Sequence, residues 1–200
     1  PAVYSVTHGG YDDLEVGDVN HDGLTDVVVM SGQGLVPNLG ILLQNNSGTL
    51  HTPSYHNVGN NILTHGVAIG DVNGDGRNDI VVTYGGNQPT SKIGAFLQNA
   101  SGLFLTAVSY ASYDIPEPVR IADVNNDGRA DIIVLHGGWL RAGVYLQKAD
   151  GTLNSEALFA IPDASHYNPH GFAVGDINGD GKKDIAIADY NNGLVILYRQ

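Results

Sequence analysis

One short acidic motif occurs four times along this 200-residue chain, at intervals of 53, 52 and 53 residues. Each copy has oxygen-bearing side chains at positions 1, 3, 5 and 9 and a glycine at position 6. Ca²⁺ takes six to eight oxygen ligands at about 2.3–2.6 Å, and glycine allows the sharp turn that brings such ligands together. The pattern therefore predicts four calcium-binding loops, at Asp18–Asp26, Asp71–Asp79, Asp123–Asp131 and Asp176–Asp184.

Each predicted site uses four side chains and the main-chain carbonyl oxygen of position 7. The expected ligands are Asp18, Asn20, Asp22, Leu24 and Asp26; Asp71, Asn73, Asp75, Arg77 and Asp79; Asp123, Asn125, Asp127, Arg129 and Asp131; and Asp176, Asn178, Asp180, Lys182 and Asp184.

The residues around the loops exclude an EF-hand or dockerin, in which helices flank the loop and a glutamate stands at position 12. Position 12 is apolar in all four copies and lies in a short β-branched run, which is typical of a strand. These residues are Val29, Val82, Val134 and Ile187. A second short apolar segment precedes each loop, so we predict that each loop joins two strands of a hairpin.

Each repeat continues with two further predicted strands separated by turn residues, and helical periodicity is absent throughout. Four antiparallel strands in about 50 residues are typical of a β-propeller blade, whereas a parallel β-helix has shorter repeats. We predict one all-β domain over residues 1–200. Its repeats lie at approximately 12–58, 65–113, 117–162 and 170–200.

The two ends of the chain suggest how the blades assemble. The fourth repeat contains three predicted strands, and residues 1–6 resemble fourth strands such as Pro53–Val58. Residues 1–6 are therefore expected to complete the last blade as an N-terminal strand. A ring of four blades in one chain is the favoured assembly. The alternatives are a ring of eight blades from two chains and a piece of a larger propeller, so monomer and homodimer both stay open.

With these motifs, the chain resembles the FG-GAP/VCBS repeat family, whose blades occur in integrin α-subunit heads, lectins and propellers of some polysaccharide lyases. The resemblance covers essentially the whole chain and implies a calcium-loop propeller. The literal Phe-Gly and Gly-Ala-Pro signatures are absent, and family members usually have seven or eight blades. The resemblance therefore does not distinguish between lectin, adhesin and lyase functions.

The composition argues against some kinds of binding partner. The formal charge is −12, and twelve of the 21 acidic residues lie in the four loops, so four Ca²⁺ ions would leave a charge of −4. Nine basic residues without a cluster argue against nucleic acid. No apolar run approaches the roughly 18 residues of a membrane helix, so membrane insertion is not expected. Because cytosolic free calcium is low, four such loops indicate a secreted, extracellular protein.

The edge of the propeller opposite the calcium loops is the predicted ligand-binding surface. Its residues differ between repeats and include several histidines, unlike the near-identical loops. Aromatic rings stack on sugars, and charged or polar groups bind hydroxyls, so the ligand is expected to be a carbohydrate or an extracellular protein. The competing interpretation is a set of ordinary solvated loop residues. The candidates are His65, Tyr84, Glu117, His136, Trp139, Arg141, His170 and Asp189.

Catalysis is not the favoured function. The chain has no cysteine and no Gly-x-Ser-x-Gly motif. The second hypothesis is a polysaccharide lyase with His170, His65 or Tyr84 as base, and a purely structural spacer is the third. A transition-metal site of His65, His136 and His170 would require these side chains to converge. The favoured function is an exported, calcium-stabilised lectin-like or adhesin-like module.

Overall fold

The computed structural model describes residues 2–6, 11–31, 39–59, 62–161 and 171–200. These residues form four antiparallel sheets whose strands follow chain order, and they contain no helix. The first sheet comprises β1 (Tyr11–Gly17), β2 (Asp26–Ser31), β3 (Leu39–Leu42) and β4 (Ser54–His56); the second, β5 (Thr64–Gly70), β6 (Asp79–Tyr84), β7 (Lys92–Phe96) and β8 (Val108–Ala111); the third, β9 (Pro116–Ala122), β10 (Asp131–His136), β11 (Arg141–Tyr145) and β12 (Ala157–Ala160); and the fourth, β13 (Phe172–Gly175), β14 (Asp184–Asp189) and β15 (Gly193–Leu197).

The predicted all-β class and the four hairpins around the acidic motifs are confirmed. No helix in the described part of the chain is long and apolar enough to cross a membrane. The register is also repeated, because the last residue of each first strand pairs with the aspartate at motif position 9. These pairs are Gly17 with Asp26, Gly70 with Asp79, Ala122 with Asp131 and Gly175 with Asp184.

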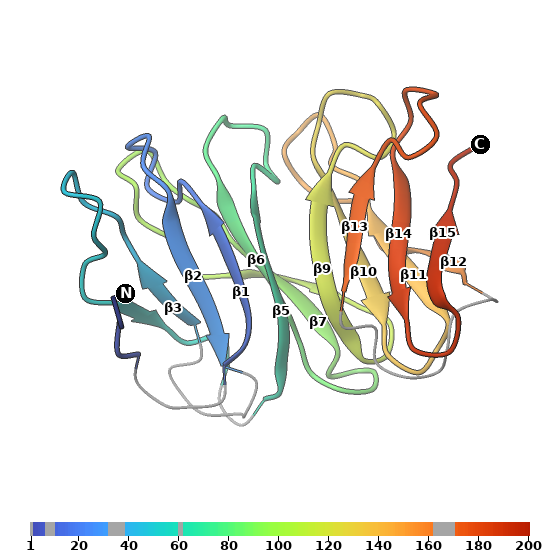
Figure 1. The fold of residues 1–200 in the computed structure, drawn as a ribbon, viewed down its shortest axis with the longest axis horizontal. Coiled ribbons are helices and arrows are strands. Elements are labelled where there is room, and N and C mark those ends of the chain that lie inside the picture. Colours follow the sequence, from blue (N-terminus) through green and yellow to red (C-terminus); the bar gives the residue numbers. More distant parts are fainter. Residues whose placement is uncertain (1, 7–10, 32–38, 60–61, 162–170) are drawn as a thin grey trace.

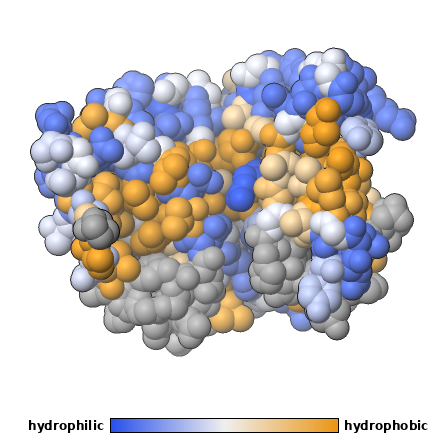
Figure 2. Space-filling view, in the orientation of Figure 1, coloured by the Kyte–Doolittle hydropathy of each residue, from blue (hydrophilic) through white to orange (hydrophobic). Residues whose placement is uncertain are grey.

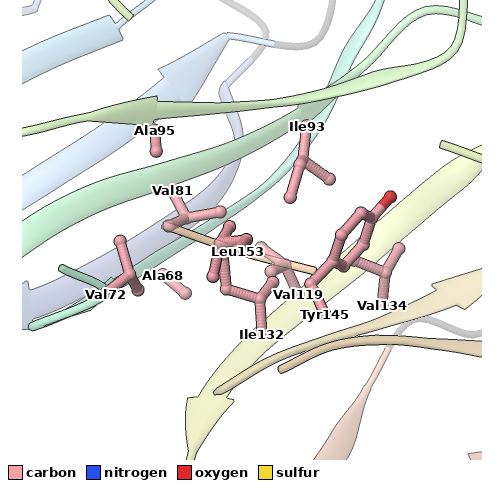
Figure 3. Packing of buried hydrophobic residues seen from close by; sticks show 10 residues of the cluster. All are labelled: Ala68, Val72, Val81, Ile93, Ala95, Val119, Ile132, Val134, Tyr145 and Leu153. Carbon is pink, nitrogen blue, oxygen red and sulfur yellow. The ribbon is translucent and has the colours of Figure 1, made fainter. Parts of the chain in front are cut away.

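Apolar side chains between successive sheets form three buried clusters. Strands β6 and β10 are buried along nearly their whole length because each of their sheets is covered on both faces. Between the second and third sheets, Val81 and Ile93 pack near Val134 and Tyr145, as Figure 3 shows. The stacking of sheets therefore provides the core of the molecule.

The four sheets are arranged in an open arc. Strand β1 contacts β5, β5 contacts β9, and β9 contacts β13, and these four strands stand in a row in Figure 1. No extended contact joins β1 to β13 among the described strands. The first and last sheets consequently lie at opposite ends of the arc, each with one face that no described sheet covers.

The predicted closure of the last sheet by residues 1–6 is not formed within this chain. Among the described residues the fourth sheet has three strands, and residues 2–6 belong to none. The Tyr4 hydroxyl instead accepts a hydrogen bond from the Leu50 amide, at 3.1 Å. The N-terminal segment thus contacts the first sheet, because the open arc holds the fourth sheet away from it (Figure 1).

Candidate functional site

The four acidic loops lie together along the upper edge of the arc in Figure 1, which we call the loop edge. In the first loop, the Asp22 amide donates to Asp18 Oδ1 and to Asn20 Oδ1, both at 3.1 Å. The other three loops repeat this pair of bonds at 2.9–3.2 Å. In every loop, side-chain oxygens of positions 1 and 3 therefore converge on the amide of position 5.

Glycine at position 6 is required by the backbone. Its φ lies between 82° and 84° in all four loops, a left-handed conformation that other residues adopt at a cost. The amide of this glycine donates to the other carboxylate oxygen of position 1, as Gly23 does to Asp18 Oδ2 at 2.8 Å. The loop backbone thus fixes the orientation of the first carboxylate.

The aspartate at position 9 holds the loop to the sheet. Asp79 is fully buried, and its carboxylate accepts hydrogen bonds from the Val72 amide (3.1 Å) and from the Gln98 amide (2.8 Å). Val72 is the second residue of the loop, whereas Gln98 follows the third strand of the sheet. The other three repeats make the same two bonds.

The carboxylates of a loop influence each other's ionisation. Burial raises the pKa of Asp79 to about 6; the Gln98 and Val72 amides oppose that shift, while the charges of Asp75 and Asp71 reinforce it. At position 1 of the last loop, the Gly181 amide leads a group of loop amides that lower the pKa of Asp176. In the third loop both effects occur together: the pKa of Asp131 is raised, chiefly by burial, and loop amides lower that of Asp123.

These loops offer donors that suit a hard cation, since every side chain at positions 1, 3, 5 and 9 presents oxygen. In the described residues, however, no three acidic or histidine side chains are already gathered closely enough to hold an ion by themselves. Asp75 and Asp127 pair instead with Arg77 and Arg129 at position 7 of their own loops. The donor set fits Ca²⁺ if these carboxylates turn inward and the Asn and carbonyl oxygens complete the shell.

A second group of polar side chains lies at the opposite edge of the third sheet. His136 is buried, and its Nε2 is 2.9 Å from Glu156 Oε1, while its Nδ1 is 3.0 Å from the Asp114 carbonyl oxygen. The other oxygen of Glu156 accepts the Tyr113 amide at 2.6 Å. Gly143 makes room for this pair, since a Cβ there would overlap Glu156 and His136 Nε2.

Glu117 adjoins this group and is 7% exposed. Its carboxyl atoms lie where a Cβ of Gly137 would stand, and its Oε2 has no hydrogen-bond partner in the described part of the chain. Burial raises the pKa of Glu117 to about 7. A carboxyl group with such a pKa can give or take a proton near neutrality.

An aromatic pair extends from the group toward solvent. The Tyr113 ring meets the His136 ring edge to face at 5.5 Å between centroids, and the Trp139 ring at 6.1 Å. Trp139 is 45% exposed. Arg141, at the start of β11, is partly buried and its guanidinium donates to the Leu140 carbonyl oxygen. The structure therefore brings Glu117, His136 and Trp139 into one neighbourhood.

Family comparison matches this repeated arrangement. The model of the FG-GAP-like repeat matches residues 18–82, 71–134 and 135–192, which together span most of the chain. The chain belongs to the FG-GAP-like repeat family. A search of curated proteins found no significant match.

The remaining candidates at the opposite edge stay within their own FG-GAP-like repeats. The Tyr84 hydroxyl is 2.7 Å from Ser109 Oγ, and His65 Nε2 is 2.9 Å from the Gly85 carbonyl oxygen. Asp189 Oδ1 accepts the Asn191 and Asn192 amides and so closes the turn between β14 and β15. These residues have local partners and do not join the group around His136.

His170 lies outside the described residues, so the predicted histidine cluster and the proposed lyase base at that position are not addressed by the structure. Sequence reasoning missed Glu156 and Tyr113. A signal for Glu156 exists in the repeat register: it precedes β12 where the first two FG-GAP-like repeats have Pro53 and Ala107. A charged residue replacing an apolar one at that position indicates a local polar contact.

Proposed function

We propose that this chain is a calcium-stabilised β-propeller module, exported from the cell, that binds a carbohydrate or another extracellular ligand at the edge opposite its loops. The observation that carries the calcium part is the convergence of position 1 and position 3 oxygens in all four loops. Membership of the FG-GAP-like repeat family supports blades of a propeller. The four stacked antiparallel sheets agree with that architecture.

In this proposal a bound Ca²⁺ supplies charge neutralisation for the loop. Three carboxylates within one nine-residue loop repel one another, as the upward influence of Asp71 and Asp75 on the Asp79 pKa illustrates. The protein contributes the Asn amide oxygen, the position 7 carbonyl oxygen and a backbone fixed by glycine. Position 9 links the loop to the third strand, so the cation would stabilise the sheet as well as the loop.

Isothermal titration calorimetry with Ca²⁺ tests the metal proposal directly. Four sites are expected per chain, and Asp18→Ala is expected to reduce the count to three. Asp150→Asn is the matched control, because Asp150 is an acidic residue in a turn outside the loops and asparagine keeps its bond to the Thr152 amide. No heat of binding to the unmodified chain would refute calcium binding.

The ligand-binding part of the proposal relies on the third sheet. A half-exposed Trp139 beside Tyr113 offers a platform on which a sugar ring can stack, and Arg141 lies at the beginning of the adjoining strand. The polar group behind them, Glu117 and the His136–Glu156 pair, provides acceptors and donors for hydroxyls. Such a combination of one apolar platform and a few polar groups is common in ligand sites.

A glycan array on the protein tests this part, with Trp139→Ala as the disruptive variant. Loss of glycan binding in that variant, with an unchanged melting temperature, supports the site. Trp139→Phe should retain part of the binding, because the ring face remains. Tyr190→Ala is a matched control, as Tyr190 is an exposed aromatic residue in the turn between β14 and β15, away from the third sheet. Equal binding by all four proteins, or no binding by the unmodified one, refutes the site.

Glu117 is the feature that favours the enzymatic alternative, since a carboxyl group with a pKa of about 7 can act as a general acid or base. Incubation with acidic polysaccharides, followed by ultraviolet detection of unsaturated products, tests a lyase. Product formation that Glu117→Gln abolishes would favour the enzyme over the lectin. If the protein neither binds glycans on the array nor forms unsaturated products, the structural spacer is favoured.

A further inference from the structure

The first two junctions between neighbouring sheets use the same apolar contact, and the third has the corresponding residues. A Cβ on Gly17 would lie 3.0 Å from Ile69 of the second sheet, and a Cβ on Gly70 would lie 2.7 Å from Ile121 of the third. At the third junction, Ala122 and Val174 pack in one cluster. A small residue at the end of one first strand thus receives a branched side chain from the next sheet.

The first and fourth sheets, at the two ends of the arc, each carry one of the two residues needed for a fourth contact of this kind. Val16 occupies the position of Ile69, Ile121 and Val174 in the strand register, and it is 52% exposed. Gly175 occupies the position of the receiving residue. No described atom outside its chain neighbours lies within 4 Å of the place where its Cβ would stand. One end therefore carries a branched side chain without a receiving glycine, and the other end carries the glycine.

Polar contacts along the loop edge also join the second and third sheets, each to the loop of the preceding sheet. The side-chain amide of Gln98 donates to the Val19 carbonyl oxygen in the preceding loop, and that of Gln147 donates to the Asp71 carbonyl oxygen at 3.2 Å. Gln44, the equivalent residue of the first sheet, donates to Thr25 of its own loop. The first sheet would make the same bond if a preceding loop stood beside it.

The glycines in the turns after the third strands also approach a preceding loop in the second and third sheets, but not in the first. A Cβ on Gly102 or on Gly151 would lie 3.1 or 2.5 Å from a carbonyl oxygen of the preceding loop, that of Asn20 or Asn73. At Gly48, the equivalent glycine of the first sheet, no described atom outside its chain neighbours lies within 4 Å. The first sheet therefore presents a surface shaped for an acidic loop of the same kind.

Tyr4 contacts the first sheet at a position equivalent to one where the second sheet contacts the first. His56, in the outer strand of the first sheet, contacts Phe104 of the second, ring to ring, at 6.2 Å. Leu50 is the equivalent of Phe104, since both pair with the glutamine that follows the third strand. Its amide donates to the Tyr4 hydroxyl. Tyr4 thus contacts the first sheet as the outer strand of the first sheet contacts the second.

The fourth sheet has a matching gap. A cavity of about 510 Å³, lined mainly by apolar residues that include Leu146, Phe159 and Leu197, opens beside its outer strand β15. Val3, next to Tyr4, is 92% exposed and so does not pack on the first sheet. Val3 is therefore available to enter such a cavity in another molecule.

We propose that two copies of this chain pair end to end, so that the first sheet of each covers the fourth sheet of the other. Val16 of one copy packs on Gly175 of its partner, and residues 2–6 of that copy add a strand along β15 with Val3 in the apolar cavity. Added strands of this kind satisfy the unpaired edge of a sheet.

The positions of the two ends favour a pair over an open chain of copies. Figure 2 shows apolar surface over the first sheet at the left and over the fourth sheet at the right, on the same side of the molecule. A copy related by a two-fold axis covers both surfaces at once, which closes the assembly. Ends that faced opposite sides would instead have produced a filament.

Sedimentation velocity on the 200-residue protein, with and without Ca²⁺, tests the proposal independently of the metal. We expect twice the chain mass of 21.1 kDa. A single chain mass at all concentrations, or a mass above two chains, would overturn the pairing. V16E, G175R and V3E should each reduce the mass to that of one chain. L105E is the matched control, because Leu105 is also 52% exposed but lies in the second repeat.

Mixing the first two variants gives the sharpest test. V16E and G175R dissociate alone, yet an equimolar mixture should recover the two-chain mass. In the mixed pair, one junction keeps native Val16 and Gly175, and the other places the V16E carboxylate against the G175R guanidinium. Dissociation of each variant without recovery in the mixture would overturn this contact. Persistence of the pair in both single variants would overturn it equally.

Discussion

The loop edge and the opposite edge of the same sheets differ in how strictly they repeat. At the loop edge, four aspartates at position 9 accept the same two amides in every sheet. At the opposite edge, the equivalent strand ends hold Tyr84, His136 and Asp189, whose partners are a serine hydroxyl, a glutamate and turn amides. One edge is constant and the other varies residue by residue.

The difference follows from what each edge must satisfy. Backbone amides are identical in every repeat, so side chains that bond to them are held constant by the register of the strands. At the opposite edge some partners are themselves side chains, as in the Tyr84–Ser109 and His136–Glu156 contacts, and such pairs can change together without disturbing the sheet. The constant edge therefore reports the fold, and the variable edge is the one where we propose ligand binding.

Removal of Ca²⁺ is expected to have the largest effect and to act through the loop edge. At a hundredfold excess over Kd, each proposed site adds about 2.7 kcal/mol to the free energy of unfolding. Differential scanning calorimetry should show a marked fall in melting temperature with chelator and recovery with Ca²⁺. Mg²⁺ should restore less, because it demands octahedral geometry. An unchanged melting curve after complete chelation contradicts this.

Asp79→Ala tests the link between loop and sheet. The substitution leaves the Val72 and Gln98 amides without their acceptor, so we expect a loss of about 3–5 kcal/mol in the free energy of unfolding. Urea denaturation with chelator present measures it. Asp75→Ala in the same loop is the control, because it removes a carboxylate that is not buried. Similar losses for both variants without metal would show that position 9 has no special structural role.

His136→Ala tests the opposite edge, where we expect a loss of about 2–4 kcal/mol because Glu156 keeps a partly buried carboxylate without its imidazole partner. Tyr84→Phe at the equivalent position removes one hydroxyl contact and should cost about 0.5–1.5 kcal/mol. Urea denaturation compares the two. Equal costs would mean that the His136–Glu156 pair is no more important than the Tyr84–Ser109 contact.

Glu117→Gln should give the smallest effect, visible as a change in pH dependence. The folded protein raises the pKa of Glu117 from 4.5 to about 7, so it holds this proton more tightly than the unfolded chain does. The associated stability is complete below pH 4.5 and is lost as the pH rises to about 7. Across this window the free energy of unfolding of the variant should therefore rise relative to that of the unmodified protein, by about 1–2 kcal/mol after solvent screening. A constant difference between the two from pH 4 to about 8 would contradict the shift.

The sequence predicted the loop edge well because its information is local. Nine-residue motifs and flanking β-branched runs are readable without tertiary contacts, and the four hairpins follow from them. The structural role of position 9 was not readable in the same way. Asp26 bonds to Gln44, 18 residues later, through a register that only the paired strands establish.

The opposite edge was predicted in part. Glu117, His136 and Trp139 do come together, but Glu156 belongs to another strand and was missed, while Tyr84, His65 and Asp189 keep local partners. The likeness of residues 1–6 to a fourth strand predicted closure of the last sheet, which the described residues do not form. Local sequence does not specify which sheet a strand joins, and the open arc keeps this segment away from the fourth sheet.

The buried aspartate at position 9 also changes what a motif match can mean. Because it ties a loop amide to the end of a neighbouring strand, mutation away from aspartate would be selected against even in a repeat that had lost its ion. Positions 1, 3 and 5 would then drift while position 9 persisted. In related repeats, a surviving ninth aspartate is therefore a sign of intact architecture, and only the first five positions distinguish a working ion site from a relic.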